Sequence, residues 1–122
     1  MPAPMIGFDL VEPRRLAERL QRTPALAHEL FHPGERAYAE SQPNPIENLA
    51  ARFAAKEAVV KALGLDGFDP LDVEVLGGGE NCSLALHGAV AERAGELGVE
   101  VMISLSHLDS MAGAVALARP AT

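Results

Sequence analysis

An alternating pattern near the start of the chain predicts the first strand. Residues 5–11 place apolar side chains at every second position and set Gly7 and Asp9 on the opposite face. An aspartate inside an apolar strand is disfavoured unless it lies at the strand end, is paired or binds a metal. Asp9 is therefore either a cap for the helix that begins near Pro13 or a ligand, and Gly7 would leave room for a bound group. The apolar positions are Ile6, Phe8 and Leu10.

A long helix is predicted from about Pro45 to Leu63. Asn44 is a good N-cap, and Glu47 follows it by three residues, as in a capping box. Gly64 provides the C-terminal stop. Six alanines make this helix slim, so other backbone segments can pack close to it.

The remaining pattern indicates an α+β fold. Shorter helices are expected over Pro13–Arg22, Pro24–Leu30, Glu35–Glu40 and Gly88–Leu97. Strands are expected over Asp72–Leu76, Cys82–Leu86, Val99–Ser106 and Met111–Ala118, the last two as an antiparallel hairpin. Helices grouped between strands differ from a regular βαβ alternation.

Composition narrows the function classes. The 122 residues suit a single domain, 1–122, and the single cysteine excludes an intrachain disulfide, which favours a reducing compartment. There is neither a signal peptide nor an apolar run of membrane-spanning length, so we expect a cytoplasmic protein without membrane contact. The net charge of −7 argues against nucleic-acid binding.

One basic stripe stands out against this acidic background. Four of the ten Lys and Arg residues fall within nine positions. In a regular helix, three of them recur at i, i+4 and i+7 on one face. This stripe is either a dock for an acidic partner or an ordinary solvated face, partly balanced by Glu12 and Glu18. The three aligned residues are Arg15, Arg19 and Arg22, and the fourth is Arg14.

The run RFAAKEAVVKAL at residues 52–63 contains both lysines of the chain. Glu57 and Lys61 are four residues apart and share a helix face, whereas Lys56 points elsewhere. The simplest interpretation is one surface ion pair. Together with Asp9, however, Glu57 offers two hard oxygen ligands, which suits Mg²⁺ bound to a phosphate group. The candidate phosphate ligands are then Arg52, Lys56, Lys61 and His107.

The histidines do not suggest other chemistry. His107 shares the strand parity of the apolar positions before it, and Ser106 faces the other way, so the two neighbours do not form a catalytic Ser-His pair. His28, His32 and His87 have no companions at metal-ligand spacing, so the sequence predicts no zinc site.

Three motifs, taken together, resemble the short bacterial holo-acyl-carrier-protein synthases, which are 4′-phosphopantetheinyl transferases. They are IGFDLVE at 6–12, RFAAKEAVVKAL at 52–63 and ISLSH at 103–107. Length, motif order and spacing agree over nearly the whole chain. The segment FHPGER at 31–36 is similar to a variant in actinobacterial members.

The resemblance implies a small antiparallel sheet packed on a long helix, a homotrimer, and active sites between subunits. It implies transfer of the phosphopantetheine arm of coenzyme A to a serine of an apo acyl carrier protein, with release of adenosine 3′,5′-bisphosphate, in fatty acid biosynthesis. Asp9 and Glu57 would bind Mg²⁺ with the coenzyme A pyrophosphate, and Lys61 would neutralise phosphate charge and assist catalysis.

The resemblance also assigns the coenzyme A contacts and the docking helix. Arg52, Ser106 and His107 would contact coenzyme A, with His107 facing Asp9 and Glu57 of a neighbouring chain. The first helix would dock on the acidic carrier protein, with Arg15 and Arg22 at the matching basic positions. Arg19 stands where the family often has an apolar residue. Many members carry G-K-P or G-x-P where this chain has Gly79-Glu80-Asn81.

Two alternatives remain open. The chain would also fit a catalytically silent trimer that binds coenzyme A or a nucleotide on the same fold. The other alternative is a transferase of the same chemistry that acts on a carrier domain of a polyketide or peptide synthetase. The sequence does not identify the group that takes the serine proton.

Overall fold

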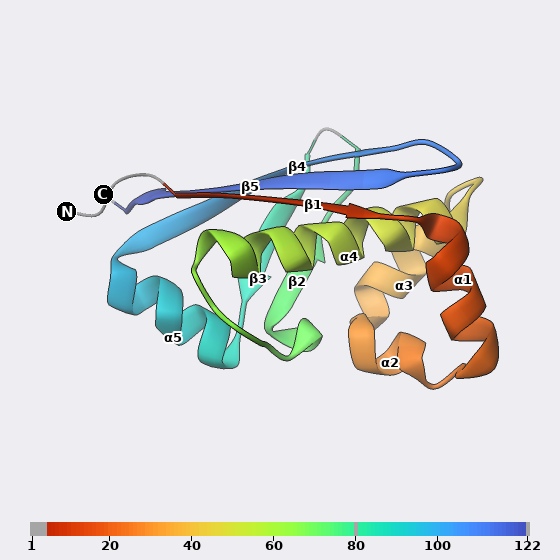
Figure 1. The fold of residues 1–122 in the computed structure, drawn as a ribbon, viewed down its shortest axis with the longest axis horizontal. Coiled ribbons are helices and arrows are strands. Elements are labelled where there is room, and N and C mark those ends of the chain that lie inside the picture. The colour runs from red at the N-terminus through yellow and green to blue at the C-terminus, as the bar shows by residue number, and fades with distance from the viewer. Residues whose placement is uncertain (1–4, 80, 122) are drawn as a thin grey trace.

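A three-stranded antiparallel sheet lies along one long helix (Figure 1). The computed structural model describes residues 5–79 and 81–121. The sheet has the order β1 (Met5–Val11), β5 (Ala112–Pro120), β4 (Val99–His107), and the helix is α4 (Pro45–Ala62). The expected α+β class and the hairpin of the last two strands are confirmed.

The other elements pack around α4. The short helices α1 (Pro13–Arg22), α2 (Leu26–Leu30) and α3 (Pro33–Glu40) gather at its N-terminal half (Figure 1). A two-stranded sheet of β2 (Val73–Leu76) and β3 (Ser83–Leu86) is followed by α5 (Gly88–Leu97). None of the helices described is long and apolar enough to cross a membrane.

Gly7 sets the distance between β1 and α4. A Cβ atom built on Gly7 would lie 1.9 Å from the carbonyl oxygen of Ala58, so the strand backbone rests directly on the helix. The alanines of α4, including Ala54, Ala55 and Ala58, are fully buried beneath the sheet. Gly7 therefore makes room for the helix, and the expectation that it leaves space for a ligand is wrong.

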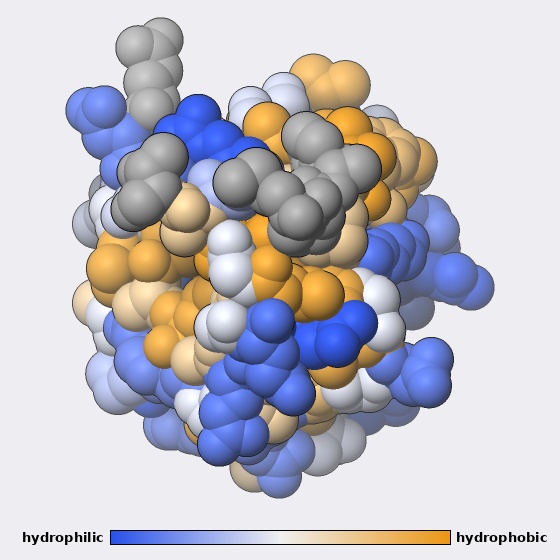
Figure 2. Space-filling view, turned by 90° about the vertical axis from the view of Figure 1, so that its left-hand side faces the viewer, coloured by the Kyte–Doolittle hydropathy of each residue, from blue (hydrophilic) through white to orange (hydrophobic). Residues whose placement is uncertain are grey.

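The apolar face of β1 points away from this core. Ile6, Phe8 and Leu10 are 69%, 54% and 53% exposed, and Met102 of β4 and Leu117 of β5 are exposed as well. We call this set the outer sheet face. At the end of the molecule that carries the termini, hydrophobic surface lies between patches of hydrophilic side chains (Figure 2).

The start of α4 differs from the predicted capping box. Asn44 makes no side-chain cap. Glu47 does not reach back to the cap either, because its carboxylate contacts His107 Nδ1 at 2.9 Å. Glu47 thus pairs with His107, a distant residue, instead of with the backbone of the cap. Helix α2 also begins later than expected, at Leu26, because Pro24 and Ala25 form a turn.

Lys56 lies in the interior rather than in a ligand site. Its side chain and that of Glu35 are both 0% exposed, and their charged atoms are 3.0 Å apart. Lys56 also donates to the carbonyls of Pro70 and Val73, and Glu35 accepts from the backbone N–H of Val75. Burial lowers the pKa of Lys56, and the Glu35 charge opposes that shift. The prediction that Lys56 is a phosphate ligand is therefore wrong.

This buried pair joins α3, α4 and β2, and its loss should be costly. We predict that Glu35→Ala lowers the free energy of unfolding by about 3–5 kcal/mol, because it leaves the Lys56 ammonium buried without its counter-charge. Glu40→Ala, on the exposed end of the same helix, is the matched control. Urea denaturation checks this, and a loss no larger than that of the control would contradict it.

Candidate active site

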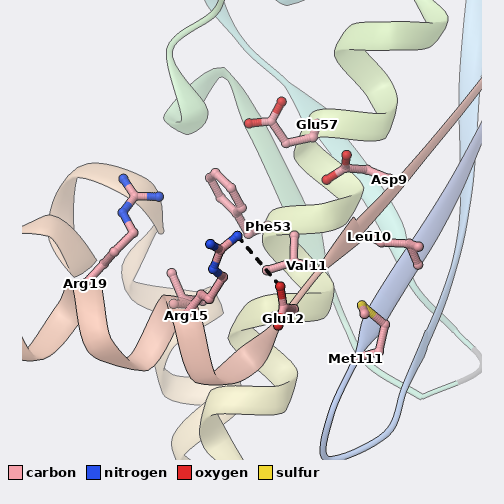
Figure 3. Close-up of a pocket in the computed structure, with 10 residues that line it drawn as sticks. Asp9, Leu10, Val11, Glu12, Arg15, Arg19, Phe53, Glu57 and Met111 are labelled. Atoms are coloured by element: carbon pink, nitrogen blue, oxygen red, sulfur yellow. Dashed lines mark ion pairs between the residues drawn. The ribbon is translucent and has the colours of Figure 1, made fainter.

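Two of the predicted carboxylates line one cavity of about 420 Å³ between β1, α1 and α4. Asp9 comes from the second half of β1, and Glu57 comes from the facing side of α4 (Figure 3). Arg15 and Arg19 of α1 and Phe53 of α4 form other walls of this cavity. Asp9 follows Gly7 by two residues, and Glu57 precedes Ala58. The close contact between Gly7 and Ala58 therefore brings the two carboxylates near each other.

Lys61 is the cationic partner of Asp9. Its ammonium donates to Asp9 Oδ1 at 2.9 Å and to the backbone carbonyl of Phe8 at 3.0 Å. The simplest expectation was an ion pair between Lys61 and Glu57, one turn apart. In the described residues the short contact goes to Asp9 instead, because the ammonium reaches across to the strand.

Glu57 is electrostatically unsatisfied. Burial raises its pKa above the ordinary 4.5, the Asp9 charge raises it further, and Lys61 opposes both effects. Two carboxylates thus share a cavity with one ammonium nearby. A hard divalent cation would relieve their repulsion, and carboxylate oxygens are the ligands that Mg²⁺ prefers. The residues present therefore fit a magnesium ion.

The arginines of α1 divide into two groups. Arg15 and Arg19 face the cavity that holds the carboxylates (Figure 3), and Arg15 lies 3.7 Å from Glu12. Arg14 pairs with Glu18 on its own helix at 3.4 Å. Arg22 lies at the exposed end of α1 and does not line this cavity. The basic stripe therefore begins at the rim of the carboxylate cavity.

A second cavity of about 440 Å³ holds the other predicted residues, Arg52, Ser106 and His107. Arg52 is 2% exposed, its guanidinium carbon lies 4.5 Å from the centre of the Tyr38 ring, and it donates to the carbonyl of Gly77. Its Nε is buried without a hydrogen-bond partner among the residues described. One donor of this guanidinium is thus still unused.

His107 is held by α4. Its Nδ1 contacts the Glu47 carboxylate at 2.9 Å, which orients the ring and leaves Nε2 for another partner. Ser106 lines the same cavity as His107, and within the described ranges no hydrogen bond joins the two side chains. The departure at Gly79-Glu80-Asn81 is only partly visible, because Glu80 lies outside the described residues.

Within one chain, the predicted site residues are therefore in two places. Asp9 and Glu57 line one cavity, with Lys61 bonded to Asp9 beside it, and Arg52 and His107 line the other. Sequence reasoning missed Tyr38 and Glu47, which position Arg52 and His107. The sequence pattern did single out Glu47, because it is an acidic residue in the first turn of α4. That pattern, however, predicted a cap for the helix and not a contact with His107.

Comparison with known proteins decides the family. The model of the 4′-phosphopantetheinyl transferase superfamily matches residues 5–109. The chain belongs to this superfamily. A holo-[acyl-carrier-protein] synthase of Moorella thermoacetica is 41% identical over 116 residues, covering 91% of this chain and 90% of the relative. One of Streptomyces coelicolor is 44% identical, covering 93% and 94%.

A solved structure from the same family has a closely similar fold. An ACPS–CoA complex of Chronobacterium ammoniagenes matches with a TM-score of 0.85 at 32% identity, covering 99% of this chain and all of the other. The family resemblance drawn from the three motifs is therefore confirmed, and so is the expected sheet packed on a long helix.

The electrostatics of the carboxylate cavity can be tested without substrate. In the Mg²⁺-free protein we predict that Asp9→Asn moves the pKa of Glu57 down towards 4.5 without reaching it, because burial is the larger cause of the shift. Since folding raises this pKa, protonated Glu57 stabilises the fold, and this contribution is lost as pH rises through the folded-state pKa.

Carboxyl ¹³C NMR titration measures the Glu57 pKa directly. Asp109→Asn, in the exposed turn after β4, is the control and should leave that pKa in place. An unchanged Glu57 pKa in Asp9→Asn would show that the two carboxylates do not interact.

Proposed function

We propose that this protein transfers the 4′-phosphopantetheine arm of coenzyme A to a serine of an apo acyl carrier protein. The observation that carries the proposal is the pair Asp9 and Glu57 in one cavity, beside a lysine, in a chain of the 4′-phosphopantetheinyl transferase superfamily. The names of the relatives and the coenzyme in the ACPS–CoA complex support this substrate pair.

In the proposed reaction, the serine oxygen bonds to the phosphorus that carries the pantetheine arm. The pyrophosphate P–O bond breaks, adenosine 3′,5′-bisphosphate leaves with the bonding electrons, and a base takes the serine proton. Anionic oxygens surround that phosphorus, so cationic groups must offset their charge. Lys61, held in place by Asp9 and the Phe8 carbonyl, supplies one positive charge next to the carboxylate cavity.

Asp9 and Glu57 would hold Mg²⁺ in this cavity. When bound, the ion supplies charge neutralisation at the pyrophosphate. Arg52, with one unused donor, and His107, with a free Nε2, are the groups we assign to coenzyme A phosphates. Ser106 lines the same cavity and is assigned to the same ligand.

We further propose that the active protein is a homotrimer with each site shared between two chains. The outer sheet face supports assembly, because five large apolar side chains on one surface are unusual for a free monomer. A shared site would also explain why one chain keeps Asp9 and Glu57 apart from Arg52 and His107. A cytoplasmic location and a role in fatty acid biosynthesis complete the proposal.

The decisive assay is the mass of the carrier protein. After incubation with coenzyme A and Mg²⁺, an apo acyl carrier protein should gain the mass of one phosphopantetheine group. No gain on fatty-acid, polyketide or peptide-synthetase carriers would favour the silent coenzyme A-binding trimer. A gain confined to a polyketide or peptide-synthetase carrier would change the carrier assignment alone.

The metal assignment predicts that Asp9→Ala and Glu57→Ala each lower the Mg²⁺-dependent rate by about a hundredfold or more. Each variant removes a ligand charge at the site of phosphoryl transfer. Glu96→Ala, an exposed carboxylate on α5, is the control and should keep the full rate. Near-normal transfer by either variant would remove that residue from the metal site.

The assembly assignment predicts that Phe8→Asp yields folded monomers with little transferase activity. Phe8 is 54% exposed in the single chain, so a charge there harms the fold little but cannot be buried against a second copy. Sedimentation velocity measures the result. Leu76→Asp, at an exposed apolar position on the other sheet, should remain trimeric. A fully active wild-type monomer would overturn the assignment.

The docking assignment predicts that exchanging Arg15 and Arg22 together for Glu raises the KM for the carrier and flattens its salt dependence. Exposed charges act mainly on association with an acidic partner. Arg14→Glu is the control, because it reverses the charge of an exposed arginine of α1 that lies off the stripe and outside the carboxylate cavity. Arg15 also lines the carboxylate cavity, so the KM for coenzyme A should rise too, but by much less than the KM for the carrier. An equal loss for both substrates would assign the stripe to the coenzyme A site.

A further inference from the structure

Three possible metal ligands meet where the starts of α3 and α5 approach β2. They are His32, Glu74 and His87, and their ligand atoms all lie within 4.8 Å of one another. The two imidazole rings have centroids 5.4 Å apart and are tilted by 46°. The sequence analysis found no companion for His32 or His87 and predicted no zinc site. It missed this cluster because the members are 42 and 13 positions apart along the chain.

The cluster is already organised by hydrogen bonds. His87 Nε2 lies 2.9 Å from Glu74 Oε1, and His32 Nε2 lies 2.7 Å from the carbonyl of Leu71. In the metal-free protein each of these ring nitrogens donates its proton to an oxygen acceptor, and a metal ion that bound the same nitrogen would release that proton. The backbone N–H of His32 also donates to Glu35, the buried partner of Lys56. These contacts fix His32 to the protein core.

We propose that His32, Glu74 and His87 form a binding site for a divalent transition-metal ion, of which Zn²⁺ is the probe. Two imidazoles and one carboxylate are a donor set that zinc accepts, with bonds of about 2.0–2.2 Å. Tetrahedral ligands at such bond lengths lie about 3.3 Å from one another, so small side-chain rotations bring these three atoms into place. Water fills the fourth position.

This site differs in chemistry and place from the carboxylate cavity. Its two nitrogen donors suit zinc, nickel or copper, whereas Mg²⁺ prefers oxygen ligands alone. None of its three residues lines the cavity of Asp9 and Glu57 or that of Arg52 and His107. A metal ion there would tie two helix starts to β2, and would stabilise the folded chain without taking part in transfer.

The test is a Zn²⁺ titration of the whole protein in excess Mg²⁺, followed by calorimetry and by imidazole NMR. One equivalent of Zn²⁺ should bind per chain and raise the melting temperature. The ring signals of His32 and His87 should shift, and those of His28 and His107 should not. His87→Ala and Glu74→Gln should each weaken binding at least about tenfold. His28→Ala, at an exposed histidine outside the cluster, should bind as wild type.

Glu74→Gln keeps the size of the side chain and still tests the site if His87→Ala fails to fold. Three results would overturn the proposal: no Zn²⁺ binding in the wild type, undiminished binding in Glu74→Gln, or ring shifts at His28 or His107 in place of His32 and His87. The last result would place the metal elsewhere on the protein.

Discussion

The contact between the backbone of β1 and the alanine face of α4 is the constraint on which the rest depends. Gly7 permits it, because any Cβ atom there would collide with the Ala58 carbonyl. The contact brings Asp9, two residues further along the strand, to the side of Glu57, the neighbour of Ala58. It also turns the apolar side chains of β1 outward. One close approach thus explains both the paired carboxylates and the exposed outer sheet face.

The run RFAAKEAVVKAL acts as two stripes on one helix. Arg52 and Lys56 are four residues apart and both buried, where they bind the backbone around β2. Glu57 and Lys61 are also four apart, and they face β1. Lys56 uses its charge to hold the fold together, whereas Arg52 binds the Gly77 carbonyl and also lines the second cavity. Glu57 lines the carboxylate cavity, and Lys61 lies beside it, bonded to Asp9. Four charged residues in one motif therefore do not share one task.

The sequence predicted the elements well, because periodicity, proline and glycine act locally. The strand Met5–Val11 and the helices that begin at Pro13 and Pro45 lie where the pattern placed them. What it could not supply was the choice between a local and a distant partner. Glu47 satisfied the rule for a capping box but bonds His107, 60 positions away.

The same limit applies to the site. Spacing indicated that Glu57 and Lys61 share a helix face, yet the Lys61 ammonium pairs with Asp9 on β1. Lys56 had the charge of a phosphate ligand, but only the fold shows that Glu35 and two carbonyls enclose it. The meeting of His32 with His87 likewise follows from how α3 and α5 start beside β2.

In the proposed trimer, each active site combines Asp9 and Glu57 of one chain with His107 of another. We expect His107→Ala, like Asp9→Ala, to be inactive alone, and mixing the two variants with subunit exchange tests the shared site. Shared sites predict that activity returns to about a quarter of the wild-type value, because random trimers place both intact residues at that share of sites. If the mixture stays as inactive as its components after exchange is demonstrated, each site lies within one chain and the shared-site arrangement is wrong.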